Sequence, residues 1–129
     1  MKLTFNQITS LMGAFNTLEE AKVPFKLGLL LARNIAALKK EEEFFIAKER
    51  EFALTYLEID PATGNLIEEG NGMFRIKADK IDECREAREA LNNFEVEIEL
   101  RKIPASLLES MEFSVDTLMA MESLIDEEA

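Results

Sequence analysis

The sequence predicts an α+β fold that is predominantly helical, with one long central helix at about residues 24–60 and a small antiparallel sheet. Apolar residues recur at every seventh position of this stretch, whose interior contains no proline, and this is the spacing of a helix. Two short apolar runs flank Gly70-Asn71-Gly72, a pattern typical of a β-hairpin. Residues 94–100 then alternate strictly between apolar and acidic side chains, as a half-buried strand does.

The seventh-position row of the central helix is expected to form the core seam, covered by the other helices of the chain. Arg33 and Asn34 are expected to mark a turn that faces solvent. The members of the row are Leu31, Leu38, Phe45, Phe52 and Ile59. Large apolar residues outside the row make the apolar arc wider than one coiled-coil seam. Three of them are a candidate oligomer interface if exposed, and core residues of a monomer if buried: Leu30, Phe44 and Leu57.

Local signals predict the elements on either side of the central helix. Thr4 and Gln7 have the spacing of a capping box, at the start of a helix predicted over residues 5–20. The hairpin of residues 65–77 and the strand of residues 94–101 are expected to form the small antiparallel sheet. Four apolar side chains of that strand are expected to face inward: Phe94, Val96, Ile98 and Leu100.

Two more helices are predicted in the second half of the chain. Asp79 is the expected N-cap of the first, which places Cys84 on its apolar side. Ser114 is the expected N-cap of the second, which runs from Val115 to about residue 126. Hydrophobic residues make up 47% of the 129 residues and charged residues 32%, which indicates one globular domain spanning residues 1–129.

The sequence also predicts where the protein works. No apolar run is long enough to span a bilayer, and the N-terminal residues lack the apolar segment of a signal peptide. Cys84 is the single cysteine, so no internal disulfide can form. These observations predict a cytoplasmic protein with no membrane segment.

The formal net charge of −11 is concentrated in the last two fifths of the chain. Residues 104–129 contain seven acidic side chains and no basic one. Such a field repels nucleic acid and attracts basic protein surfaces, although it also simply increases solubility. We therefore expect no direct nucleic-acid binding and a protein partner with a basic surface. The candidate partner-binding residues are Glu95, Glu97, Glu99, Glu109, Glu112 and Asp116.

The residue types of the chain argue against an enzyme. It has no histidine, which removes the commonest general base and the usual metal ligand, and one cysteine cannot assemble a thiolate zinc site. Glu41-Glu42-Glu43 or the three glutamates of the strand could hold Mg²⁺ or Ca²⁺, as in metal-dependent nucleases. Such runs are more often solvated faces of helices and sheets. We predict no catalytic residue, no metal ligand and no cofactor.

The order of these segments resembles a small uncharacterised protein family of phages and prophages of Gram-positive bacteria. The resemblance lies in KVPFKLGLLLARNIAALKKEEEFF, EREFALTYLEID, TGNLIEEGNGMFRIK, EALNNFEVEIELRKI and SVDTLMAMESLIDEE. It implies expression in the cytoplasm of an infected or lysogenic bacterial host, and no known enzymatic activity. It assigns no binding residues, since no motif of known role defines the family.

The sequence therefore favours a non-enzymatic, phage-encoded acidic interaction protein. By analogy with other phage proteins, it would inhibit a host defence or nucleic-acid enzyme by occupying a basic surface, as a mimic of nucleic acid does. A structural or assembly role, as a chaperone or scaffold, is the first alternative, and it would use the apolar surplus of the long helix in a homodimer or larger assembly. A carboxylate-metal nuclease is the second alternative.

Overall fold

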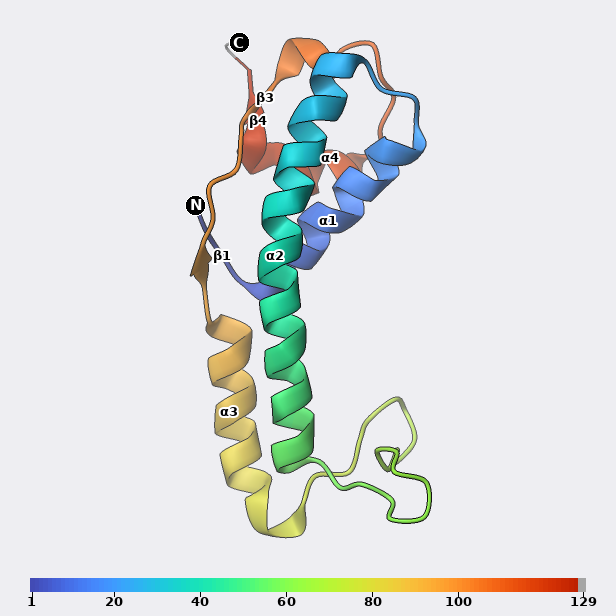
Figure 1. Ribbon diagram of the computed structural model, residues 1–129, viewed down its shortest axis with the longest axis vertical. Coiled ribbons are helices and arrows are strands. Elements are labelled where there is room, and N and C mark those ends of the chain that lie inside the picture. Colours follow the sequence, from blue (N-terminus) through green and yellow to red (C-terminus); the bar gives the residue numbers. More distant parts are fainter. Residues whose placement is uncertain (128–129) are drawn as a thin grey trace. The chain divides into compact units, whose positions relative to one another are not determined.

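The computed structural model describes residues 1–127, and within them the chain forms four α-helices and two small two-stranded sheets (Figure 1). The predicted α+β class, predominantly helical around one long helix, is confirmed. The residues pack as two compact units. Unit 1 contains Met1–Glu42 and Glu95–Ala129, and unit 2 contains Glu43–Phe94. Whether these units are one folding domain stays a prediction, because compact packing does not say whether either unit folds alone.

The long helix α2 (Phe25–Tyr56) contributes its first part to unit 1 and its last part to unit 2. It ends four residues before the predicted end near residue 60. Leu57 and Ile59 leave the helix because they form antiparallel bridges with Ile76 and Leu66, the two arms of the hairpin. Pairing that is distant in sequence has thus overridden the local helical spacing.

Helix α1 (Phe5–Glu20) packs on helix α4 (Val115–Met121) in the core of unit 1. The predicted capping box is present: the Gln7 amide lies 3.4 Å from the Thr4 hydroxyl, and the Thr4 amide donates to the Gln7 side chain at 2.9 Å. This box satisfies two amides that the first helical turn leaves free. The best-buried apolar side chains of unit 1 are Ile8, Phe15, Leu18, Leu27, Leu38, Ile103, Met121 and Leu124.

Both small sheets belong to unit 1. Strand β1 (Lys2–Leu3) pairs antiparallel with β2 (Val96–Glu97), and β3 (Ile103–Pro104) pairs parallel with β4 (Ile125–Asp126). The predicted pairing of the hairpin with the strand at 94–101 is therefore wrong: β2 pairs with the N-terminal segment. Local alternation predicted a strand over residues 94–101, of which Val96–Glu97 is one, but it carries no information about the partner strand.

The C-terminal helix α4 (Val115–Met121) begins at the predicted cap, where Ser114 Oγ accepts from the Thr117 amide at 3.2 Å. The helix is shorter than predicted. It passes into the 3₁₀ helix η3 (Glu122–Leu124) and then into β4, because residues 125–126 pair with β3.

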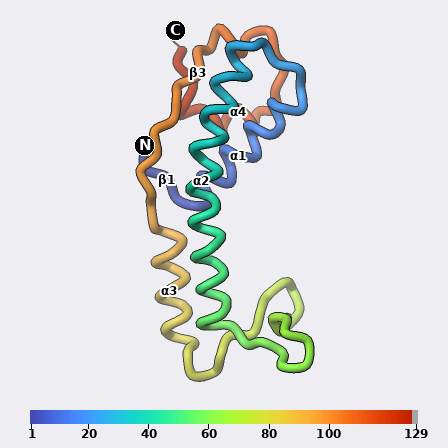
Figure 2. Tube along the Cα trace, in the orientation of Figure 1, coloured from blue at the N-terminus to red at the C-terminus, as the bar shows by residue number. Residues whose placement is uncertain are grey.

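In unit 2, helix α3 (Ile81–Asn93) runs antiparallel beside the last part of α2 (Figure 2). It follows the 3₁₀ helix η1 (Ala78–Lys80), so the predicted N-cap at Asp79 is wrong. Cys84 is buried, as expected. The predicted hairpin is present as isolated bridges around a turn, in which Asn71 has φ of 55° between two glycines of positive φ. Asparagine and glycine tolerate this left-handed backbone better than other residues.

The predicted core seam holds for part of its length. Leu31, Leu38 and Phe45 are buried, Phe52 is half-buried, and Ile59 is exposed because it lies beyond the end of the helix. Among residues 1–127, no helix is long and apolar enough to cross a membrane.

Candidate interaction surfaces

The first candidate surface is the acidic segment, residues 95–99. Glu95, Glu97 and Glu99 are all exposed, while Ile98 between them is buried. The Met1 amino group donates to Glu97 Oε1 at 2.8 Å, and this bond and its charge lower the pKa of Glu97. One carboxylate of the three is therefore already ion-paired, and Glu95 and Glu99 are the two that a partner meets without displacing that amine.

A buried asparagine holds the chain just after the acidic segment. The Arg101 amide donates to Asn34 Oδ1 at 2.8 Å, and Asn34 Nδ2 donates to the Arg101 carbonyl at 3.0 Å. Asn34 is 1% exposed, so the expectation that it faces solvent is wrong. The Asn34–Arg101 pair gives an extended segment the hydrogen bonds that a neighbouring strand would otherwise supply.

Spacing along the sequence contained a signal for this burial. Asn34 follows Leu27 and Leu31 and precedes Leu38 at intervals of four, three and four residues, which place the four side chains on one helical face. A polar residue in line with three buried leucines indicates a buried hydrogen bond more strongly than a solvent-facing turn.

The other three candidate acids lie in a different part of unit 1. Glu109, Glu112 and Asp116 are exposed, and they occupy the connection after the 3₁₀ helix η2 (Ala105–Leu107) and the first turn of α4. In Figure 1 this connection and β2 lie on opposite sides of the first part of α2. The six candidates thus form two groups of three rather than one continuous patch, and their role in binding stays a prediction.

The candidate residues of an oligomer interface differ in how exposed their side chains are. Leu30 and Leu57 are half-buried, whereas Phe44 is 38% exposed. Phe44 belongs to an apolar groove in unit 2 with a volume of about 380 Å³. We call it the α2–α3 groove, and its lining residues are Phe44, Lys48, Ala87, Ala90, Leu91 and Phe94.

Aromatic rings form one end of the α2–α3 groove. The ring centroid of Phe94 lies 6.1 Å from that of Phe44 and 6.2 Å from that of the buried Phe45. Phe94 is 49% exposed, so its predicted inward position is wrong: it is the C-cap of α3 rather than a strand residue. Lys48 Nζ lies 5.7 Å from the Phe44 ring centroid and 3.3 Å from Glu51 Oε2.

A charged pair holds the two helices of this groove together. Arg88 on α3 donates two hydrogen bonds to Glu49 on α2, one of 2.9 Å from Nη1 to Oε2 and one from Nη2 to Oε1. The guanidinium also lies over the Phe52 ring, 4.5 Å from its centroid. The hydrogen bond with Glu49 raises the pKa of Arg88. This paired and stacked arginine fixes the position of α3 on α2.

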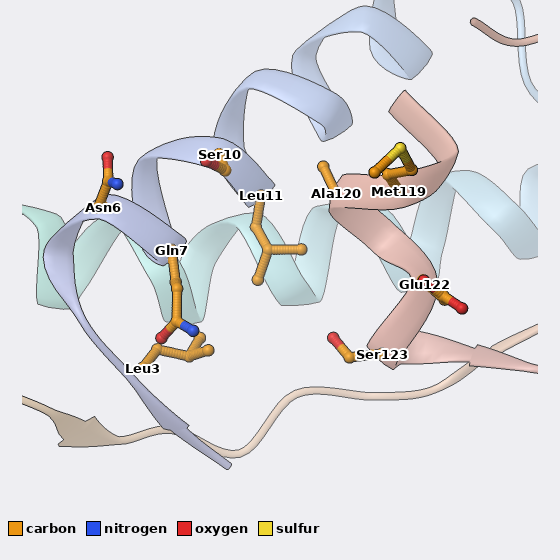
Figure 3. Close-up of a pocket in the computed structure, with 9 residues that line it drawn as sticks. All are labelled: Leu3, Asn6, Gln7, Ser10, Leu11, Met119, Ala120, Glu122 and Ser123. Carbon is orange, nitrogen blue, oxygen red and sulfur yellow. The ribbon is translucent and has the colours of Figure 1, made fainter. Parts of the chain in front are cut away.

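A second groove, of about 590 Å³, lies between α1 and α4 (Figure 3). Its α1 wall carries Asn6, Gln7 and Ser10, and the opposite wall carries Met119 of α4 and Glu122 of η3. Glu122 is the one ionisable side chain among the described residues that line it. The lining of this groove therefore offers hydroxyl and amide groups and one carboxylate.

Within residues 1–127, no three or more acidic or cysteine side chains are close enough together to hold a metal ion. The glutamates at 41–43 and those of the acidic segment therefore form no such group. Comparison of the chain with family models, with curated proteins and with solved structures finds no significant match in any of the three.

Proposed function

We propose that this protein is a non-enzymatic acidic interaction protein that binds a basic surface on another protein. One observation carries the proposal: Glu95 and Glu99 are exposed on a segment whose backbone pairs with β1 between them, at Val96–Glu97, and is held by the Asn34–Arg101 pair after them. From the resemblance described above, we expect this activity in the cytoplasm of a phage-infected or lysogenic bacterial host. There the protein would inhibit a host defence or nucleic-acid enzyme.

Fixed carboxylates suit this role for a physical reason. A charged side chain on a held backbone loses less conformational entropy on binding than one on a mobile loop. Complementary charge also speeds encounter with a basic partner, and salt reduces that effect. The formal net charge of −11 acts in the same direction at long range.

The proposal is tested by affinity capture from a Gram-positive host lysate with three proteins: the wild type, Glu95→Gln/Glu99→Gln, and Glu19→Gln/Glu20→Gln. Both double variants remove two exposed charges, but Glu19 and Glu20 lie at the end of α1. We expect a specific protein to be captured by the wild type and the α1 variant, less strongly as salt rises, and to be lost with the segment variant. Equal capture by all three proteins contradicts a role for the acidic segment.

An assembly role is the second candidate, because three large apolar side chains of unit 1 are strongly exposed. Phe25 is 82% exposed, Val115 70% and Met119 67%. An assembly protein buries such residues against further copies. Light scattering over a range of protein concentrations tests this: growth in mass with concentration favours assembly, and a constant mass excludes it.

A further inference from the structure

We propose that the α2–α3 groove binds an amphipathic helix with a basic polar face, presented by the partner protein. This inference rests on the proposed function and names the surface and the partner segment for it. The proposal is carried by three features that occur together. The rings of Phe44 and Phe94 are 38% and 49% exposed, alanines lie beside them, and acidic residues lie at the edge of the groove.

The dimensions of the groove fit a helix. The stretch from Ala87 to Phe94 spans about 10 Å at the helical rise of 1.5 Å per residue, which is two helical turns. Ala87 and Ala90 have short side chains, so a partner helix can approach the α3 backbone there, with the neighbouring Phe44 and Phe94 rings at one end of the groove. Two apolar anchors seven residues apart on the partner would match this length.

The charges around the groove select the partner's polar face. Glu83 and Glu86 lie one helical turn before Ala87 and Ala90, on the same face of α3, and both are exposed. On α2, the charge of Lys48 is already paired with Glu51. The edge is therefore net acidic, and residues 43–94 as a whole carry twelve acidic and seven basic side chains. Lysine or arginine beside the partner's apolar stripe would complement it.

A second copy of the chain is a poorer occupant. Each copy carries a formal net charge of −11, so two copies repel one another, and an isologous contact would desolvate the same acidic edges on both sides. A basic partner is attracted by the same negative charge that repels a second copy.

The test uses a synthetic peptide of about 18 residues with leucines at i, i+3, i+4 and i+7 spacing, lysines elsewhere and one tryptophan. A scrambled peptide of the same composition lacks the apolar face. The protein contains no tryptophan, so tryptophan fluorescence reports the peptide alone. We expect saturable binding of the amphipathic peptide, at least about tenfold weaker binding of the scrambled one, and weaker binding as salt rises.

Three variants locate the binding. Phe94→Ser removes half of the aromatic end, and we expect a loss of at least about tenfold in affinity. Phe25→Ser removes an even more exposed phenylalanine from unit 1 and is expected to change nothing. Ala90→Gln places a longer side chain in the groove, at an exposed helical position, without changing the charge. We expect it to lower the affinity for the peptide as much as Phe94→Ser does, although it removes no aromatic ring.

The outcomes separate this inference from the proposed function. Binding that survives both Phe94→Ser and Ala90→Gln, or no saturable binding of the amphipathic peptide, overturns the groove. A concentration-dependent dimer that Ala90→Gln abolishes also overturns it, in favour of a second copy. If capture from lysate needs Glu95 and Glu99 but tolerates Ala90→Gln, the function stands and the groove fails. If Ala90→Gln abolishes both capture and peptide binding while Glu95→Gln/Glu99→Gln abolishes neither, the groove stands and the acidic segment fails.

Discussion

The two units differ in how much of their apolar surface is buried. Of the sixteen apolar residues that are buried among residues 1–127, fourteen lie in unit 1, and only Phe45 and Cys84 lie in unit 2. Unit 2 is nevertheless rich in large apolar residues. Those that are exposed there are Phe44, Ile46, Leu54, Ile59, Met73, Phe74, Ile81 and Phe94.

This contrast shows that the units are stabilised by different interactions. Unit 1 has a dry core, in which apolar burial supplies most of the stability. Unit 2 depends on half-exposed rings, on the Arg88–Glu49 pair and on the hairpin's hydrogen bonds. A region with few buried apolar contacts opens locally at lower free energy than a dry core does. The same shortage of burial leaves unit 2 with apolar surface for a partner.

The largest expected effect comes from the two buried phenylalanines. Phe15→Ala in unit 1 should lower the free energy of unfolding by about 3–5 kcal/mol. Phe45→Ala in unit 2 should cost less, because Phe44 and Phe94 can move into the space that it leaves. Urea denaturation measures both, and Phe25→Ala, at an exposed position, is the control with an expected change within about 0.5 kcal/mol. An equal or larger cost for Phe45→Ala contradicts the contrast between the units.

The second effect concerns the Asn34–Arg101 pair of unit 1. Asn34→Ala leaves the amide and carbonyl of Arg101 without their side-chain partner, and we expect a loss of about 2–3 kcal/mol. Asn16→Ala, at an exposed position of α1, should change stability by less than about 0.5 kcal/mol. Thermal denaturation of the two variants checks this. Similar midpoints for both would show that water replaces the lost bonds and that the pair does not hold the segment.

The third effect is smaller and local to unit 2. Arg88→Ala removes a half-exposed charged pair and its stacking on Phe52, which we expect to cost about 1 kcal/mol. Hydrogen exchange should become faster in α3 while the α1 amides keep their protection. Arg85→Ala, which removes an exposed arginine from the same helix, is the matched control. If hydrogen exchange became equally faster in both units, the two units would unfold together and would not differ in local stability.

The smallest effect is a pH dependence in unit 1. Because the Met1 amine lowers the pKa of Glu97 in the folded protein, this carboxylate stabilises the fold above its unfolded pKa. That contribution is lost as the pH falls through the lowered pKa, below the ordinary glutamate value of about 4.3. An NMR titration of the Glu97 carboxyl carbon measures the pKa. Acetylation of the Met1 amine should return it towards the ordinary value, and an unchanged titration would refute the pairing in solution.

Two of the three predicted N-caps were correct and the one at Asp79 was wrong, whereas no element with a distant cause was predictable from the sequence. The capping box at Thr4 and the cap at Ser114 each depend on residues three apart, and both are present. The partner of β2, by contrast, lies at the other end of the chain, and no local pattern indicates it. The end of α2 depends on bridges to the hairpin, which helical spacing does not report.

The candidate site was predictable to a similar extent. Alternation placed Glu95, Glu97 and Glu99 correctly on an exposed face. It could not show that the Met1 amine pairs with Glu97, because that contact depends on the sheet register. The α2–α3 groove was missed because Phe94 was assigned to a strand, whereas it ends a helix. Phe94 follows Ala87 and Ala90 at intervals of seven and four residues. If the predicted helix is continued to Phe94, the three residues therefore lie on one face of it.

The division of the chain between the two units also has a kinetic consequence. Unit 2 is continuous in sequence, whereas unit 1 needs residues from both ends of the chain. During synthesis, the contacts of residues 43–94 can form early, because they close short loops. The N-terminal helix must wait for its partners in α4, and β1 must wait for β2. The buried leucines of residues 1–42 therefore lack these partners until β2 and α4 have left the ribosome, and in that interval the unfinished chain is most open to chaperones and to aggregation.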